Sequence, residues 1–142
     1  MLSVPNTENL KFTNEIDAIR NESTMLRQSG VNIIVVLSHC GLDRDRIIAI
    51  ECGDYVDVIV GGHSHSFLFT PNDEILPDTM RETPVGPYPL VLTPKSGKER
   101  KVLIVHASAF TKYIGDLRVY FNDKGFVKYY DGNPIYLGNE VI

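Results

Sequence analysis

The chain has 142 residues, of which 43% are hydrophobic and 23% charged, and its formal net charge is −4. This length and composition fit a single globular domain and exclude a disordered chain. No cluster of Lys or Arg stands out, so we expect no nucleic-acid partner. No apolar stretch approaches the roughly 20 residues that span a bilayer, and residues 1–5 lack the regions of a signal peptide. Cys40 and Cys52 are too few to form a disulfide framework.

The first element that the sequence predicts is a helix from about Thr13 to Ser29. Thr13 or Asn14 can cap its start, and Gly30 can end it. One face of this helix carries residues spaced three or four positions apart: Ile16, Ile19, Ser23 and Leu26. The Val- and Ile-rich run over residues 31–37 follows at once and predicts a buried parallel strand.

A second helix is expected to begin with Asp43 as its cap and to end at Gly53. Its inward face is expected to carry Ile47, Ala49 and Ile50. A second Val- and Ile-rich strand begins near Val56. Two parallel strands joined by a helix form a unit with a right-handed crossover, which is typical of α/β folds.

The rest of the chain is expected to be rich in β-strands. A proline-rich segment from Thr70 to Pro89 predicts a long ordered loop. Four strands follow, over Leu90–Thr93, Lys101–Ala107, Tyr113–Phe121 and Phe126–Tyr130. Ser96-Gly97 and the segment 122–125 supply hairpin turns. Leu117, Val119 and Phe121 alternate with polar residues, which is typical of a strand with one wet face.

Three histidines follow the two parallel strands. His39 comes after the first strand, and His63 and His65 come after the second in the motif Gly-Gly-His-Ser-His. The carboxyl ends of parallel strands share one sheet edge, where ligands bind in open α/β folds. Neutral imidazole is a common metal ligand, and the glycine pair allows close backbone approach. We therefore expect His39, His63 and His65 to converge in part of a metal site.

Other interpretations of these residues remain open. A single histidine after a strand is more often a surface or core-edge residue than a ligand. His106 also follows a predicted strand but has no partner motif. Cys40, next to His39, can be read as a soft metal ligand, but without a Cys-x-x-Cys spacing we favour a small packed residue.

Several segments resemble the 5'-nucleotidase family of metallophosphoesterases, which includes animal ecto-5'-nucleotidases and salivary apyrases of blood-feeding arthropods. The resemblance is carried by His39–Gly41, by the helix after it and by Val56–Leu68. It continues through Ala109–Gly115 to Gly132–Ile135 and starts near Leu10. It thus covers nearly the whole chain, and the Gly-Gly-His-Ser-His motif is its most specific part.

The resemblance implies an α/β fold, the C-terminal half of a metallophosphoesterase-like α/β/β/α sandwich with parallel strands followed by a β-rich part. Residues 1–142 would be a partial catalytic domain, and the family's C-terminal nucleotide-binding domain would be absent. The resemblance also implies two divalent metal ions, expected to be zinc. His39 and His63 match ligands of one ion and His65 a ligand of the other, and no catalytic residue is assigned to this chain.

The sequence also departs from the family pattern. Many 5'-nucleotidases carry an amide at the position of His65, although the broader phosphoesterase motif has histidine there. Relatives commonly carry a neutral amide at the position of His106, so we expect a packing or hydrogen-bonding role for it. The upstream motifs Asp-x-His, Gly-Asp-x-x-Asp and Gly-Asn-His are missing. Gly53–Asp57 and Gly138–Glu140 mimic two of them, and we interpret both as coincidences.

The expected function is metal-dependent hydrolysis of a nucleoside monophosphate by a parent enzyme in which this chain carries half of a two-metal site. An apyrase acting on ATP and ADP is the alternative, and a non-catalytic metal- or partner-binding remnant is the alternative of another class. We expect the isolated chain to be inactive. By the same resemblance the parent would bind an AMP-like nucleotide, form a homodimer and act outside the cell or at its surface, where a lipid anchor would be its only membrane contact.

Overall fold

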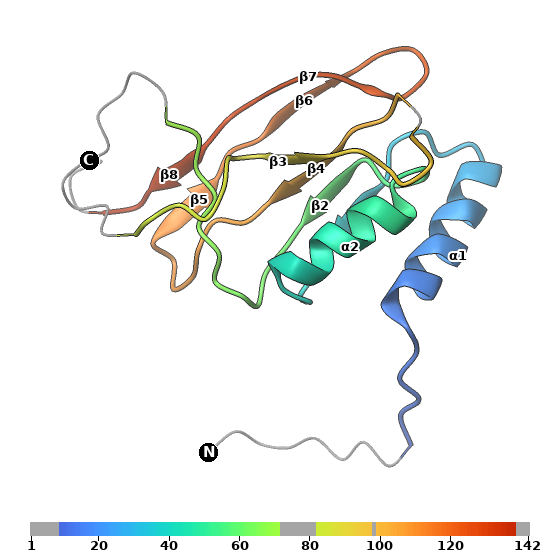
Figure 1. Ribbon diagram of the computed structural model, residues 1–142, viewed down its shortest axis with the longest axis horizontal. Coiled ribbons are helices and arrows are strands. Elements are labelled where there is room, and N and C mark those ends of the chain that lie inside the picture. Colours follow the sequence, from blue (N-terminus) through green and yellow to red (C-terminus); the bar gives the residue numbers. More distant parts are fainter. Residues whose placement is uncertain (1–8, 72–81, 98, 139–142) are drawn as a thin grey trace.

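The computed structural model describes residues 9–71, 82–97 and 99–138. In chain order its elements are α1 (Glu15–Gln28), β1 (Val35–Leu37), α2 (Leu42–Cys52), β2 (Val58–Val60), β3 (Leu90–Leu92), β4 (Val102–Val105), β5 (Tyr113–Gly115), β6 (Arg118–Phe121), β7 (Val127–Asp131) and β8 (Pro134–Tyr136). Figure 1 shows α1 and α2 on one side of a sheet and the β6–β7 hairpin on the other. Neither helix has the length and apolarity needed to cross a membrane.

The central sheet has the strand order β1-β2-β4-β3. β1, β2 and β4 are parallel, with Val36 beside Ile59 and Ile59 beside Ile104, whereas β3 is antiparallel to β4. All of β4 is buried, which is typical of a strand covered on both faces. The two predicted strands are parallel, as expected, but β1 is shorter than the predicted 31–37. The prediction that this first strand is buried was wrong, because β1 is the edge strand of the sheet and Val35 and Leu37 are exposed. Because β1, β2 and β4 are parallel, their carboxyl ends lie at one edge of the sheet.

Helix α1 begins and ends where the sequence predicts. The Asn14 side chain accepts hydrogen bonds from the backbone N–H groups of Ile16 and Asp17. Gly30 follows the helix with φ of +93°, a conformation that costs glycine little. Ser23 lies buried on the predicted inward face and donates to the carbonyl of Ile19.

Helix α2 differs from its prediction at its start and on its buried face. Gly41, rather than Asp43, occupies the N-cap position. The buried residues are Leu42, Asp45, Ile48, Ala49 and Cys52, whereas Ile47 and Ile50 are exposed. This spacing is helical, but it places a carboxylate in the middle of the inward stripe. The prediction of Ile47 and Ile50 as inward residues was wrong, because the buried face of α2 runs through Asp45 and Ile48 instead, whereas Ala49 is buried as predicted.

The strand predicted over Tyr113–Phe121 is two strands, so that prediction was wrong. β5 pairs with β8, whereas β6 pairs with β7 through the predicted turn at residues 122–125. Gly115 ends β5 with its backbone close to the hydroxyl of Tyr88, which a Cβ would approach to 2.8 Å. The predicted Ser96-Gly97 turn joins β3 and β4 as expected. Half of the predicted loop at 70–89, residues 72–81, lies outside the described residues.

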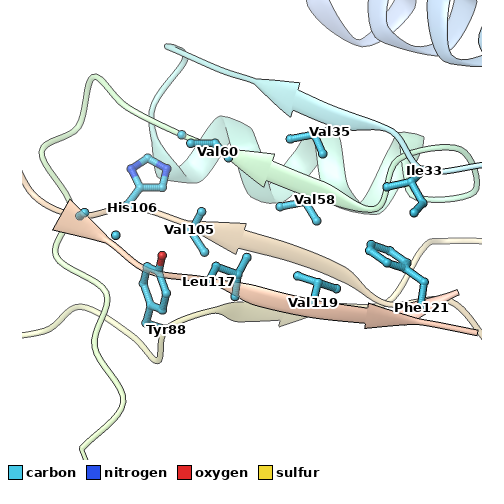
Figure 2. Close-up of a pocket in the computed structure, with 13 residues that line it drawn as sticks. Ile33, Val35, Val58, Val60, Tyr88, Val105, His106, Leu117, Val119 and Phe121 are labelled. Atoms are coloured by element: carbon cyan, nitrogen blue, oxygen red, sulfur yellow. The ribbon is translucent and has the colours of Figure 1, made fainter. Parts of the chain in front are cut away.

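A cavity of about 480 Å³ lies between the central sheet and the β6–β7 hairpin. In Figure 2, Val35 and Val58 of the sheet point toward Leu117 and Val119 of the facing chain segment. His106 lies near one end of this cavity. The helices, the sheet and the hairpin form the α/β/β layers of the predicted sandwich. The described residues contain no second helical layer.

At the opposite edge of the sheet, the buried side chain of Asp57 connects several segments of the chain, and it is 1% exposed. Its carboxylate accepts hydrogen bonds from Arg27 at 2.7 Å, from Arg100 at 2.6 Å and from the backbone N–H of Ile34 at 2.8 Å. The Arg100 guanidinium also lies over the ring of Phe126, 4.6 Å from its centroid. Asp57 thus has a structural role at the end of β2 away from the histidines. This agrees with the interpretation that Gly53–Asp57 matches the family's Gly-Asp-x-x-Asp motif only by coincidence.

Candidate metal centre

The structure brings His39 and His63 together at the carboxyl edge of the sheet. Their ring centroids are 5.2 Å apart, with the ring planes inclined by 67°. Gly62 lies so close to His39 that a Cβ there would be 3.1 Å from its Nδ1. Both histidine side chains are exposed. The glycine before His63 therefore admits the neighbouring imidazole, as the close-approach argument expected.

His65 does not join this pair. Its ring lies edge-on to the ring of Phe110, with centroids 5.1 Å apart and planes inclined by 74°. Across the part of the chain that the structure describes, no three His, Cys, Asp or Glu side chains are arranged to hold a metal ion. The expected convergence thus extends to His39 and His63 only. Two imidazole donors suit zinc as half of a four-ligand set.

A buried hydrogen-bonded group lies directly beneath this edge. His106 Nε2 is 2.7 Å from Asp45 Oδ2, and Ser38 Oγ donates to Asp45 Oδ1 at 2.5 Å. Both members of the Asp45–His106 pair are fully buried. A Cβ at Gly61 would lie 2.0 Å from His106 Nε2. Gly61 is therefore required by the pair, and His106 has the hydrogen-bonding role that the sequence interpretation favoured.

Asp45 and Ser64 matter to this edge and were missed by the sequence interpretation. Asp45 connects α2 to Ser38, the residue before His39. Ser64 Oγ accepts from the backbone N–H of Leu42 at 3.0 Å and lies 2.8 Å from Ser66 Oγ. Ser64 thus caps α2 from the loop between the two histidines. The sequence contains one signal for the burial of Asp45. It lies three residues after Leu42, and residues three apart share one face of a helix.

The cysteines lie in different environments. Cys40 is exposed and unpaired, so its interpretation as a packed residue was wrong. Its backbone N–H donates to Ser38 Oγ at 3.2 Å, which positions the main chain and leaves the thiol outside. Cys52 is buried on α2, and this burial raises the pKa of its thiol. Neither residue forms a disulfide.

Comparisons with known proteins point to one family. The chain is 47% identical over 138 residues to an apyrase of Anopheles gambiae, a match that covers 97% of this chain and 24% of that protein. It is 44% identical over 140 residues to a 5'-nucleotidase of Bos taurus, over 99% of this chain and 23% of that protein. No protein-family model matches the chain.

The fold gives the same result. It matches the crystal structure of a 5'-nucleotidase precursor from Thermus thermophilus with a TM-score of 0.77 and 36% identity, over 88% of this chain and 23% of that one. The chain spans about a quarter of the length of these curated relatives. The predicted metallophosphoesterase-type α/β fold is confirmed. By sequence and by fold, nearly the whole length of this chain is similar to one segment of the 5'-nucleotidases and apyrases.

Proposed function

We propose that this chain is part of a nucleotide phosphohydrolase and carries half of its two-metal site. The observation that carries the proposal is the His39–His63 pair, with rings 5.2 Å apart at the ends of two parallel strands. Relatives named 5'-nucleotidase and apyrase support hydrolysis of nucleotide phosphate as the reaction. The two expected ions are divalent and zinc is the expected metal, with His65 as a ligand of the second.

The residues of this chain contribute position rather than proton transfer. His39 and His63 each offer a neutral imidazole nitrogen, the donor type that zinc accepts. The Asp45 carboxylate holds Ser38 and His106, and thereby fixes the ends of β1 and β4 beneath the pair. When bound, divalent metal ions would polarise the phosphoryl group and lower the pKa of the attacking water. No side chain of this segment need act as the general acid.

The substrate is a nucleotide, and two substrate classes are compatible with the relatives. A 5'-nucleotidase releases phosphate from a nucleoside monophosphate, whereas an apyrase acts on ATP and ADP. Names of both kinds occur among the relatives at similar identity. We keep the monophosphate as the first choice, and an extracellular or cell-surface location and a homodimer as further proposals from the resemblance. Release of phosphate from AMP, ADP and ATP by the parent enzyme separates the two classes.

A zinc titration of the purified chain tests the metal assignment. We expect weak binding, because a pair of cations held by imidazoles without a bridging carboxylate repel each other at short range. His39→Ala and His63→Ala should each weaken this binding further, while Lys128→Ala, an exposed change on β7, should leave it as in the unchanged chain. Equal zinc affinity in all four proteins would refute the histidine assignment.

The alternative of another class is a non-catalytic metal- or partner-binding remnant. It is favoured by the lack of a three-ligand group in the described residues. Assays of AMP hydrolysis, with and without a chelator, address it directly. We expect no turnover by the chain alone, and robust chelator-sensitive hydrolysis would mean that the site is complete. The transcript upstream of Met1 decides for the parent, since the enzyme proposal requires in-frame Asp-x-His and Gly-Asn-His motifs there.

A further inference from the structure

Backbone strain is concentrated in two loops at the histidine edge. Within the described ranges, positive φ occurs outside glycine at His63, His65, Ser108, Phe110 and Thr111, with values of 76°, 51°, 61°, 59° and 56°. Such conformations are uncommon for residues with a side chain and persist only where the surroundings impose them. Residues 61–66 are called here the His loop, and residues 108–112 the Phe110 loop. Strain of this kind clusters at functional sites, so the Phe110 loop needs an explanation.

The two loops are joined to each other. The backbone N–H of Ser108 donates to the carbonyl of Ser66 at 2.9 Å, and Phe67 forms a β-bridge with Ala107 just outside them. The ring of Phe110 contacts that of His65 from one loop to the other, at 5.1 Å between centroids. Phe110 is 79% exposed, so core packing does not account for its placement.

Both ends of the Phe110 loop are held by one carboxylate. Glu82 accepts a hydrogen bond from Ser108 Oγ at 2.5 Å and pairs with the ammonium group of Lys112. The hydrogen bond from Lys112, followed by that from Ser108, lowers the pKa of Glu82, and the same pairing raises the pKa of Lys112. The carbonyl of Lys112 also accepts from the backbone N–H of Leu137 at 2.8 Å. The loop is thus fixed at both of its ends.

We propose that the Phe110 loop is a positioning element for His65, in which the Phe110 ring holds the imidazole in one orientation. Edge-to-face aromatic contacts are directional, so Phe110 restricts the rotation of a side chain that is otherwise exposed. A ligand oriented before binding loses less freedom when it binds, and groups that orient a ligand therefore raise metal affinity. This role rests on the proposed function, because it concerns the ligand expected for the second metal ion. Phe110 acts through His65 and is not a catalytic residue.

The orientation itself is testable without metal. In NMR spectra of the metal-free chain, the ring current of Phe110 should displace the ring-proton resonances of His65. Phe110→Leu, which keeps an apolar side chain, should remove this displacement while leaving the resonances of His39 and His63 in place. Tyr120→Leu is the matched control, because Tyr120 is an exposed aromatic residue of β6 whose ring contact is with Tyr129. Unchanged His65 resonances in Phe110→Leu would overturn the proposal.

The consequence for metal binding is measured on the same samples. Zinc added to the unchanged chain should shift the His65 resonances, and Phe110→Leu should need about tenfold more zinc for the same shift. Glu82→Gln should weaken the response in the same direction by loosening the loop. Equal zinc dependence in the unchanged chain and in Phe110→Leu would overturn the positioning role. If no histidine resonance responds to zinc, the proposed function fails, and the metal-free displacement still decides whether Phe110 orients His65.

Discussion

Removal of the charge on Asp57 should destabilise the fold more than any other single change of charge at the sheet edge. In Asp57→Asn, Arg27 and Arg100 lose the carboxylate that binds them at 2.7 and 2.6 Å. Both arginine side chains are largely buried, with 18% and 11% of their surface exposed. Removing one partner of a buried ion pair costs about 3–5 kcal/mol, because the remaining charge stays desolvated. This is a large part of the roughly 5–15 kcal/mol by which such domains are stable.

Urea unfolding of the purified chain measures this loss. With a slope of about 2 kcal/mol per molar urea, the midpoint of Asp57→Asn should fall by about 2 M at an unchanged slope. Asp43→Asn is the matched control, because Asp43 pairs with Arg46 at 3.2 Å while 95% exposed. An exposed pair contributes about 0.2–1 kcal/mol. A urea midpoint for Asp57→Asn no lower than that of Asp43→Asn would refute the stabilising role of Asp57 and its two arginines at the sheet edge.

Three further predictions concern the histidine edge and the core. Gly61→Ala should lower thermal stability well below that of Gly86→Ala, because the Cβ at Gly61 would overlap the ring of His106, whereas a Cβ at Gly86 would meet only the end of the Leu68 side chain, at 3.3 Å; similar melting temperatures would contradict the packing argument. His63→Ala should reduce zinc affinity, and turnover of the parent at saturating zinc, more than His106→Gln; the reverse order would remove the basis for His63 as a ligand. Burial raises the pKa of Tyr88 to about 12. The unfolded chain therefore loses this proton first, near pH 10, and stability should fall by about 3 kcal/mol between pH 10 and 12. Tyr88→Phe should lack this part of the alkaline loss in urea midpoints, and an identical loss in both proteins would argue against the buried phenol as its source.

Local patterns were sufficient for the elements that depend on neighbouring residues. Asn14 and Gly30 mark the ends of α1 because capping and left-handed backbone are properties of a few adjacent residues. The Val- and Ile-rich runs predicted parallel strands, and parallel strands put their carboxyl ends at one edge. The proximity of His39 and His63 follows from that rule, so the candidate site was predictable in outline.

Only the tertiary structure decided which polar side chains support that site. Asp45 meets His106 across 61 positions of sequence, and Ser64 caps α2 across 22. No local pattern contains such pairs, because their energy depends on burial that forms when the layers assemble. The contact of His65 with Phe110 has the same origin. The sequence by itself determined the strand ends that carry the histidines, whereas long-range packing determined which imidazoles meet and what holds each of them.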